Sequence, residues 1–267
     1  MPDPYTNPDS QPQEAMQAMI TRLEERGRHP SFAQMIGKYA ATLPHNQPLK
    51  VLDLGCGTGV VIRQLANLLH PSSALHGADV SEGLLREAKR LGPESNIVWD
   101  HLLPGRLPYA DAVFDVVVMH TLLSHVPEPR EILSEAKRIL TASGRLIIFD
   151  ADHAGTTYNQ PDYETTRRFD ALLSSTIAAH PDICRQMPRL LKATGLELTN
   201  HDSQVISECG HGDYWLSSVR GFARLLPSLG VLSQPEAQAW ISHMLDSHAD
   251  GTFFASGTFY TFYARHG

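Results

Sequence analysis

The sequence has few cysteines and no long apolar run. Its three cysteines, Cys56, Cys184 and Cys209, are too widely spaced for a disulfide framework or a paired-cysteine zinc site. We therefore expect a reducing, cytoplasmic setting. No apolar stretch approaches the ~20 residues that a membrane-spanning helix needs. The polar, proline-rich start of the chain also lacks the apolar core of a secretion signal.

Positive charge is scarce as well. Lysine and arginine number 22 against 29 acidic residues, which gives a formal net charge of −7. Basic runs such as Lys137-Arg138 and Arg167-Arg168 are only two residues long and lie in helical patterns. A protein that binds nucleic acid usually presents a basic surface to the phosphates. We therefore expect no nucleic-acid partner.

The stretch from Leu49 to Val60 has the pattern of a buried strand, a glycine turn and the first turn of a helix. A short apolar run supplies the strand. Gly55, Gly57 and Gly59 follow at alternate positions. Glycines at this spacing let the backbone turn tightly and let a ligand approach it closely. The N-terminus of the next helix directs unpaired N–H groups at the turn. This is the pattern of a nucleotide-binding corner.

The details of the turn separate two kinds of nucleotide site. A dinucleotide-binding loop has the pattern G-x-G-x-x-G, whereas here Val60 stands where the last glycine would be. An acid, Asp53, comes two residues before the first glycine. A GxGxG loop with an acid just ahead resembles motif I of the class I S-adenosylmethionine-dependent methyltransferases. The resemblance implies S-adenosyl-L-methionine as the cofactor, bound in part by Asp53, Gly55, Cys56 and Gly57.

Polar side chains follow the next three predicted strands, at the point where each strand ends. Asp79 closes the first of them, close to where a carboxylate is needed to accept hydrogen bonds from ribose hydroxyls. In the methyltransferase family an acid at the next strand end commonly meets the adenine amino group, which points to Asp100, with His101 as the alternative. The carboxyl ends of parallel strands meet at one edge of a sheet, where ligands bind. The cofactor-binding residues predicted at these strand ends are Asp79, Val80, Asp100, His101 and His120.

Two further residues are candidates for catalysis. His125 falls on a histidine that is frequent in the family, and Asp150 ends the fifth predicted strand. A base accelerates methyl transfer to a hydroxyl or an acidic carbon, and histidine suits that role near neutral pH. We predict that His125 and Asp150 form a catalytic pair. The alternative is that His125 only packs at a helix start and Asp150 only caps a loop. No metal site is predicted, because His211 beside Cys209 lacks further ligands.

Strands and helices alternate through the middle of the chain, which predicts parallel strands joined by right-handed crossovers. The resemblance implies an α/β, Rossmann-like sheet of seven mostly parallel strands with the last strand antiparallel. We expect a helical N-terminal segment and helical lid insertions in a single domain over residues 14–267. The expected segments are a flexible tail over 1–13, N-terminal helices over 14–45, the cofactor-binding core over 46–152, and lid insertions over 153–180 and 209–251.

These features predict methyl transfer from S-adenosylmethionine to oxygen, nitrogen or carbon of a small molecule, by in-line displacement, in a biosynthetic role. Aromatic side chains in the second insertion suggest a lid over an apolar or aromatic metabolite, although packing of the inserted helices on each other explains them equally well. Three alternatives stay open: a cofactor-binding protein without methyl transfer (a pericyclic catalyst or regulatory subunit), a protein methyltransferase, and a nicotinamide dehydrogenase. The methyl acceptor, the pathway and the oligomeric state do not follow from the sequence.

Overall fold

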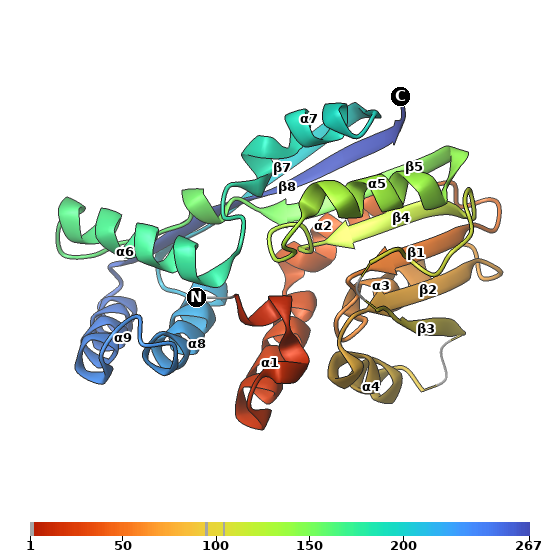
Figure 1. Cartoon of the computed structure of the whole chain (residues 1–267). Helices are drawn as coiled ribbons and strands as arrows, with labels where there is room; N and C mark the ends of the chain where they lie inside the picture. The colour runs from red at the N-terminus through yellow and green to blue at the C-terminus, as the bar shows by residue number, and fades with distance from the viewer. Residues whose placement is uncertain (1–2, 94–95, 104) are drawn as a thin grey trace.

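The computed structural model describes residues 3–93, 96–103 and 105–267. Its strands are β1 (Lys50–Leu54), β2 (Ala74–Asp79), β3 (Ile97–His101), β4 (Phe114–His120), β5 (Leu140–Ala151), β6 (Thr157–Tyr158), β7 (Leu196–Gly210) and β8 (Phe253–His266). They form one sheet in the order β3-β2-β1-β4-β5-β8-β6, with β7 paired to β8 (Figure 1). The sheet therefore has seven strands and a short eighth, β6, which lies in the first predicted lid insertion.

The direction of the strands confirms the predicted topology. β1 runs parallel to β2 and to β4, and the outer pairs β2–β3 and β4–β5 are also parallel. β8 is antiparallel to β5, β6 and β7. Because β1 to β5 are parallel, their carboxyl ends lie at one edge of the sheet, which is where the predicted site residues are found.

The helices are α1 (Gln13–Arg28), α2 (Pro30–Ala40), α3 (Val60–Leu68), α4 (Glu82–Leu91), α5 (Pro129–Ile139), α6 (Tyr163–Ile177), α7 (Ile183–Ala193), α8 (Tyr214–Ser228) and α9 (Gln234–Ala249). α2 and α3 pack on one face of the sheet, against residues such as Val51 and Val116. α5 and α7 pack on the other face, against residues such as Leu52 and Val117. Strands buried on both faces in this way read as continuous apolar runs. No helix among the described residues is long and apolar enough to cross a membrane.

α6, α8 and α9 gather at one end of the long β7–β8 ribbon (Figure 1). Trp215 of α8 stacks on Phe259 of β8 at 6.2 Å between ring centroids. Trp240 of α9 stacks on Phe169 of α6 at 5.8 Å and meets Tyr158 edge-on at 6.0 Å. These aromatic side chains are buried, so they hold the inserted helices to each other and to β8.

The start of the chain is more structured than the sequence suggests. A flexible tail is predicted over residues 1–13, whereas residues 3–10 form two 3₁₀ turns that we call the N-terminal strap. Asp3 of the strap is buried and contacts His125, in the loop after β4. Asp9 contacts the start of α4. The strap is held by specific carboxylate contacts, which its polar, proline-rich composition does not reveal.

Asp9 acts as a tertiary cap for α4. Its carboxylate accepts hydrogen bonds from Ser81 Oγ at 2.6 Å, from Glu82 N at 2.8 Å and from Gly83 N at 3.1 Å. We expect Asp9→Ala to lower the free energy of unfolding by about 1 kcal/mol, the usual cost of losing a helix cap. Urea denaturation measures this change, and Asp9→Asn should lose less because its amide oxygen still accepts. An Asp9→Ala variant as stable as the wild type would contradict the assignment.

Candidate functional site

The glycine turn follows β1 at the carboxyl edge of the sheet. Gly55, Gly57 and Gly59 all have positive φ angles, of 75°, 54° and 75°. A Cβ atom on Gly55 would lie 2.5 Å from Leu122 Cδ1, and one on Gly59 would lie 2.2 Å from the ring of Trp99. Both the backbone conformation and the lack of space therefore require glycine at the first and last of these positions. The turn is a tight backbone cradle at the start of α3.

Asp79 lies beside this cradle at the end of β2. Its Oδ2 accepts a hydrogen bond from Gly57 N at 2.8 Å, and its Oδ1 accepts one from Ser81 N at 2.9 Å. Each carboxylate oxygen has a second lone pair, so Asp79 can accept two more hydrogen bonds. Burial raises the pKa of Asp79 above its usual range. Val80, the next residue, leaves 49% of its surface exposed at the same edge. The structure thus brings together the glycine turn, Asp79 and Val80.

Asp53 is buried beneath the turn, and neither of its carboxylate oxygens has a hydrogen-bond partner among the described residues. Burial, with the charge of Asp79 as a smaller contribution, raises its pKa to about 7. The N–H of Ile62, in the first turn of α3, opposes this rise. An unpaired buried carboxyl is costly, and its place directly below the glycine turn points to a role at that turn.

The raised pKa of Asp53 predicts a particular pH dependence of stability. The folded pKa of about 7 exceeds the unfolded value of about 4, so folding favours the protonated form. This contribution is present at acidic pH and is lost as the pH rises through 7. We expect the stability of the wild type to fall by about 2 kcal/mol relative to Asp53→Asn between pH 5 and pH 8. Urea denaturation at both pH values measures it, with the exposed Asp250→Asn as control. If the difference in unfolding free energy between the wild type and Asp53→Asn were the same at both pH values, the raised pKa of Asp53 would be contradicted.

The predicted adenine-side residues lie at the end of β3, next to Val80. Asp100 Oδ2 already accepts a hydrogen bond from Tyr109 OH at 2.8 Å and lies 3.0 Å from His76 Nδ1. His101 Nε2 is hydrogen-bonded to Val80 O at 3.1 Å. His101 Nδ1 also lies 3.4 Å from Glu82 Oε1. Both side chains thus have partners within the protein, and both residues remain candidates for the adenine contact.

Two of the predicted cofactor-binding residues direct their side chains into the core. His120 stacks on Phe149 with 4.1 Å between ring centroids, and its Nδ1 lies 3.2 Å from Tyr39 OH. Burial lowers the pKa of His120 well below its usual range. Cys56 is also buried, and burial raises the pKa of its thiol well above the usual range. If these two residues contact a cofactor, they do so through their backbone atoms.

His125 and Asp150 lie near each other, but His125 has a different hydrogen-bond partner from the one predicted. His125 Nδ1 lies 2.5 Å from Asp3 Oδ2, and Thr6 Oγ1 donates a hydrogen bond to His125 O at 2.9 Å. Asp150 is buried and accepts hydrogen bonds from Ser124 N at 3.1 Å and from the N–H of the next residue at 2.9 Å. Burial raises the pKa of Asp150, and His125 opposes this rise. The two therefore interact through space, while Asp3 orients the imidazole.

Two arginines of α1 also reach this region. Arg26 Nη2 donates a hydrogen bond to Thr121 Oγ1 at 2.7 Å, just after β4. Arg22 Nη2 donates one to Ser218 Oγ of α8 at 2.5 Å. The sequence places these residues only within the predicted N-terminal helices. Neither Asp3 nor the arginines belong to a local sequence motif, so only the folded structure shows that they lie near the site.

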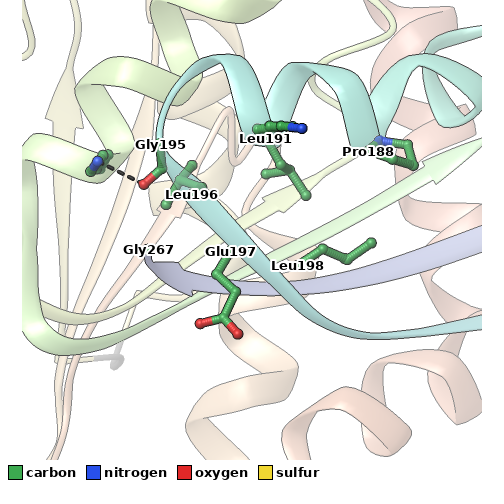
Figure 2. Close-up of a pocket in the computed structure, with 9 residues that line it drawn as sticks. Pro188, Leu191, Gly195, Leu196, Glu197, Leu198 and Gly267 are labelled. Atoms are coloured by element: carbon green, nitrogen blue, oxygen red, sulfur yellow. Dashed lines mark hydrogen bonds between the residues drawn. The ribbon is translucent and has the colours of Figure 1, made fainter.

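A pocket elsewhere on the surface is separate from this site. Figure 2 shows Leu191, Leu196 and Leu198 beside the carboxyl end of the chain, Gly267. Lys137 Nζ donates a hydrogen bond to Gly195 O at its margin, at 2.7 Å. This pocket lies toward the amino end of β5, opposite the edge that carries the glycine turn. Within the described ranges, no three His, Cys, Asp or Glu side chains are placed to hold a metal ion.

Comparisons with known proteins agree with this geometry. Residues 52–148 match the family described as a methyltransferase domain. A 37.1 kDa protein encoded in a Streptomyces fradiae transposon is 30% identical over 80% of this chain and 61% of its own length. The ubiquinone/menaquinone biosynthesis C-methyltransferase of Desulfotalea psychrophila is 35% identical over 61% of this chain and 64% of its own length. The chain spans about three fifths of the length of these relatives.

Solved structures share the fold. A methyltransferase-like protein of Bacillus halodurans has a TM-score of 0.60 at 18% identity, over 88% of this chain and 98% of its own. The [4+2]-cyclase SpnF has a TM-score of 0.58 at 17% identity, over 90% of this chain and 84% of its own. At these identities the likeness concerns the fold, which proteins with different activities share.

Proposed function

We propose, from the class I S-adenosylmethionine-dependent methyltransferase domain that this chain contains, that the protein transfers a methyl group to a small molecule. S-adenosyl-L-methionine is the cofactor of this family. The observation that carries the proposal is the glycine turn with Asp79 hydrogen-bonded to its middle glycine. The methyltransferase-domain match also decides against the nicotinamide dehydrogenase alternative.

The residues around the turn fit this cofactor. A Cβ atom at Gly55 would clash with Leu122, so glycine at this position lets Leu122 pack directly on the turn. Asp79 keeps lone pairs for the two ribose hydroxyls, and the exposed Val80 offers apolar surface to the adenine beside it. Backbone N–H groups at the start of α3 favour polar groups of the cofactor. When bound, the cofactor supplies a methyl group on a positively charged sulfur.

We assign the role of general base to His125. A carboxylate accepts hydrogen bonds, so Asp3 holds the proton of His125 on Nδ1 and leaves Nε2 free to take a proton. The acceptor atom forms its bond to the methyl carbon as the carbon–sulfur bond breaks, and its proton passes to His125 Nε2. The nearby charge of Asp150 stabilises the imidazolium that results. Asp150 therefore supports His125 electrostatically, and Asp3 positions it.

A small-molecule acceptor is supported by the relatives that share the domain, among them the ubiquinone/menaquinone C-methyltransferase and a methyltransferase of Streptomyces halstedii. The chain's excess of acidic over basic residues also speaks against nucleic acid as the acceptor. All three cysteines are free thiols, as the proposed cytoplasmic setting requires. The acceptor atom and the pathway lie outside the proposal.

Calorimetry and an activity assay test the proposal in sequence. We expect the full chain to bind S-adenosylmethionine and S-adenosylhomocysteine with measurable heat and to give none with NAD. Fractions of a metabolite extract are then screened for release of S-adenosylhomocysteine. Absence of S-adenosylmethionine binding would refute the cofactor assignment. Binding without product release from any fraction would favour a cofactor-binding protein that transfers no methyl group.

A further inference from the structure

Two guanidinium groups of α1 lie in the proposed site without a carboxylate partner. Arg22 and Arg26 are one helical turn apart and therefore project from the same side of the helix. Both are half-buried, and the ion pairs within 4.0 Å found among the described residues include neither of them. Their hydrogen-bond partners are the neutral hydroxyls of Ser218 and Thr121.

Holding these two charges together is unfavourable in the unliganded protein. Burial lowers the pKa of Arg26, and the charge of Arg22 lowers it further. Like charges one turn apart on a helix also repel. Half-buried cations normally gain a carboxylate neighbour, because an unpaired charge away from water is costly. The pair is thus poised to bind an anion.

The carboxylates of the surrounding elements are engaged elsewhere. Asp3 is bound to His125, and Asp150 to two backbone N–H groups. Glu208 of β7 accepts hydrogen bonds from three N–H groups at the start of α8, at 2.9, 2.8 and 3.1 Å. The charge of Asp150 acts on Arg26 through space, where it opposes the lowering of the pKa of Arg26. None of these acids forms an ion pair with either guanidinium group, so both groups can still take an anionic partner from a ligand.

Aromatic side chains flank both cations. The guanidinium of Arg22 lies 4.6 Å from the ring centroid of Tyr214, and that of Arg26 lies 5.0 Å from that of Phe32. Tyr5 links this region to the proposed base, since its ring centroid is 5.0 Å from that of His125. Burial raises the pKa of Tyr5, and the charges of both arginines oppose the rise. Tyr5 thus lies against His125 and within electrostatic reach of both cations.

We infer that Arg22 and Arg26 bind an oxyanion of the methyl acceptor, a carboxylate or a phosphate, with its apolar or aromatic body toward Tyr214 and Phe32. Guanidinium groups bind such anions through paired hydrogen bonds, and they also stack on aromatic faces. Anchoring the oxyanion on α1 directs the other end of the acceptor toward His125. The inference rests on the proposed function and specifies its substrate class.

S-adenosylmethionine also carries a carboxylate, so the experiment must separate two sources of the anion. The full chain is first saturated with S-adenosylhomocysteine, which occupies the cofactor's own carboxylate site. Benzoate and phenyl phosphate are then titrated by calorimetry at constant ionic strength, with benzamide as the neutral counterpart of benzoate. The variants are Arg22→Gln and Arg26→Gln, and Arg220→Gln, on the exposed side of α8, is the matched control.

We expect benzoate or phenyl phosphate to bind the wild type and Arg220→Gln alike, and to bind each α1 variant at least tenfold more weakly. Benzamide should bind at least tenfold more weakly than benzoate. The α1 variants should keep the wild-type affinity for S-adenosylhomocysteine within threefold. Their melting temperatures should equal or exceed that of the wild type, because one of two repelling charges has been removed, so lost binding would not reflect unfolding.

Three results would overturn the inference: no binding of either anion by the wild type, equal binding by the variants, or a tenfold loss of S-adenosylhomocysteine affinity in the α1 variants. The last would assign the arginines to the cofactor's carboxylate. A wild type that fails to bind S-adenosylhomocysteine would instead contradict the proposed function. Titration of the anions in the absence of S-adenosylhomocysteine would then still test whether the arginines bind an oxyanion.

Discussion

Replacing Asp79 by Ala is expected to weaken binding of S-adenosylmethionine at least a hundredfold. Two ribose hydroxyls would lose a charged acceptor, and each such hydrogen bond contributes about 1.5–3 kcal/mol. Gly57 N would also lose its 2.8 Å partner, so the glycine turn would be held less firmly. Calorimetry with S-adenosylhomocysteine measures the change directly and requires no acceptor.

Two companion variants separate recognition of the cofactor from general damage. Asp250→Ala changes an exposed acid just after α9 and should bind the cofactor as the wild type does. Asp79→Asn keeps the shape and one acceptor oxygen, so its affinity should lie between those of the wild type and Asp79→Ala. If Asp79→Ala stays folded and binds within threefold of the wild type, Asp79 does not hold the ribose.

Replacing His125 by Ala should cut the turnover number at least tenfold, and by as much as the ~10²–10⁴-fold that a general base typically contributes. Affinity for S-adenosylhomocysteine should be nearly unchanged, because Asp79 and the glycine turn are proposed to hold the cofactor and both are intact in this variant. The assay follows release of S-adenosylhomocysteine with an acceptor found in the screen. Equal turnover of His125→Ala and wild type would remove His125 as the base.

Asp3→Asn tests whether the strap positions this base. Its amide retains the size of the side chain but removes the charge that Asp3 Oδ2 places 2.5 Å from His125 Nδ1. We expect a reduced turnover number with little change in cofactor affinity, because the neutral amide holds the proton of His125 on Nδ1 less firmly. A variant at the exposed His201 of β7 serves as the control. An unchanged turnover number would leave Asp3 a purely structural contact.

The sequence predicts the core of the fold and one side of the site well. The apolar runs and alternating helices imply the parallel sheet, and the glycine spacing implies a turn whose glycines have positive φ. Asp79 beside this turn follows from the same logic, because parallel strands end at one edge. These features depend on local patterns and on general rules of sheet topology. They require no knowledge of distant contacts.

The sequence is a poorer guide to the direction in which individual side chains point. His120 ends β4, where the pattern predicts a ligand contact, yet its ring stacks on Phe149 in the core. Asp100 ends β3 and binds Tyr109. Neighbouring positions on a strand face opposite sides, so an assignment by strand end alone does not say which face a side chain occupies. β6, with only two residues, is too short for any periodicity to indicate.

Contacts between distant parts of the chain cannot be predicted from the sequence, for a different reason. Asp3 meets His125 across 122 positions of sequence, and no local pattern in the strap marks this partnership. In the sequence, the arginines of α1 look like residues on the polar side of any amphipathic helix. Only the folded chain shows that they lack carboxylate partners. The proposed substrate class therefore comes from the structure alone.

The strap also has a kinetic consequence. Its contact with His125 closes a loop of 122 positions, and long-range contacts of this kind form late because closing the loop costs entropy. The sheet and its helices can therefore be complete while the base still lacks its partner. In hydrogen–deuterium exchange, the amides of Tyr5, hydrogen-bonded to Asp3, and of Glu82, hydrogen-bonded to Asp9, should exchange together and faster than those of β1 and β4. The refolding chain would then gain methyl transfer activity only after its global spectroscopic signal is complete.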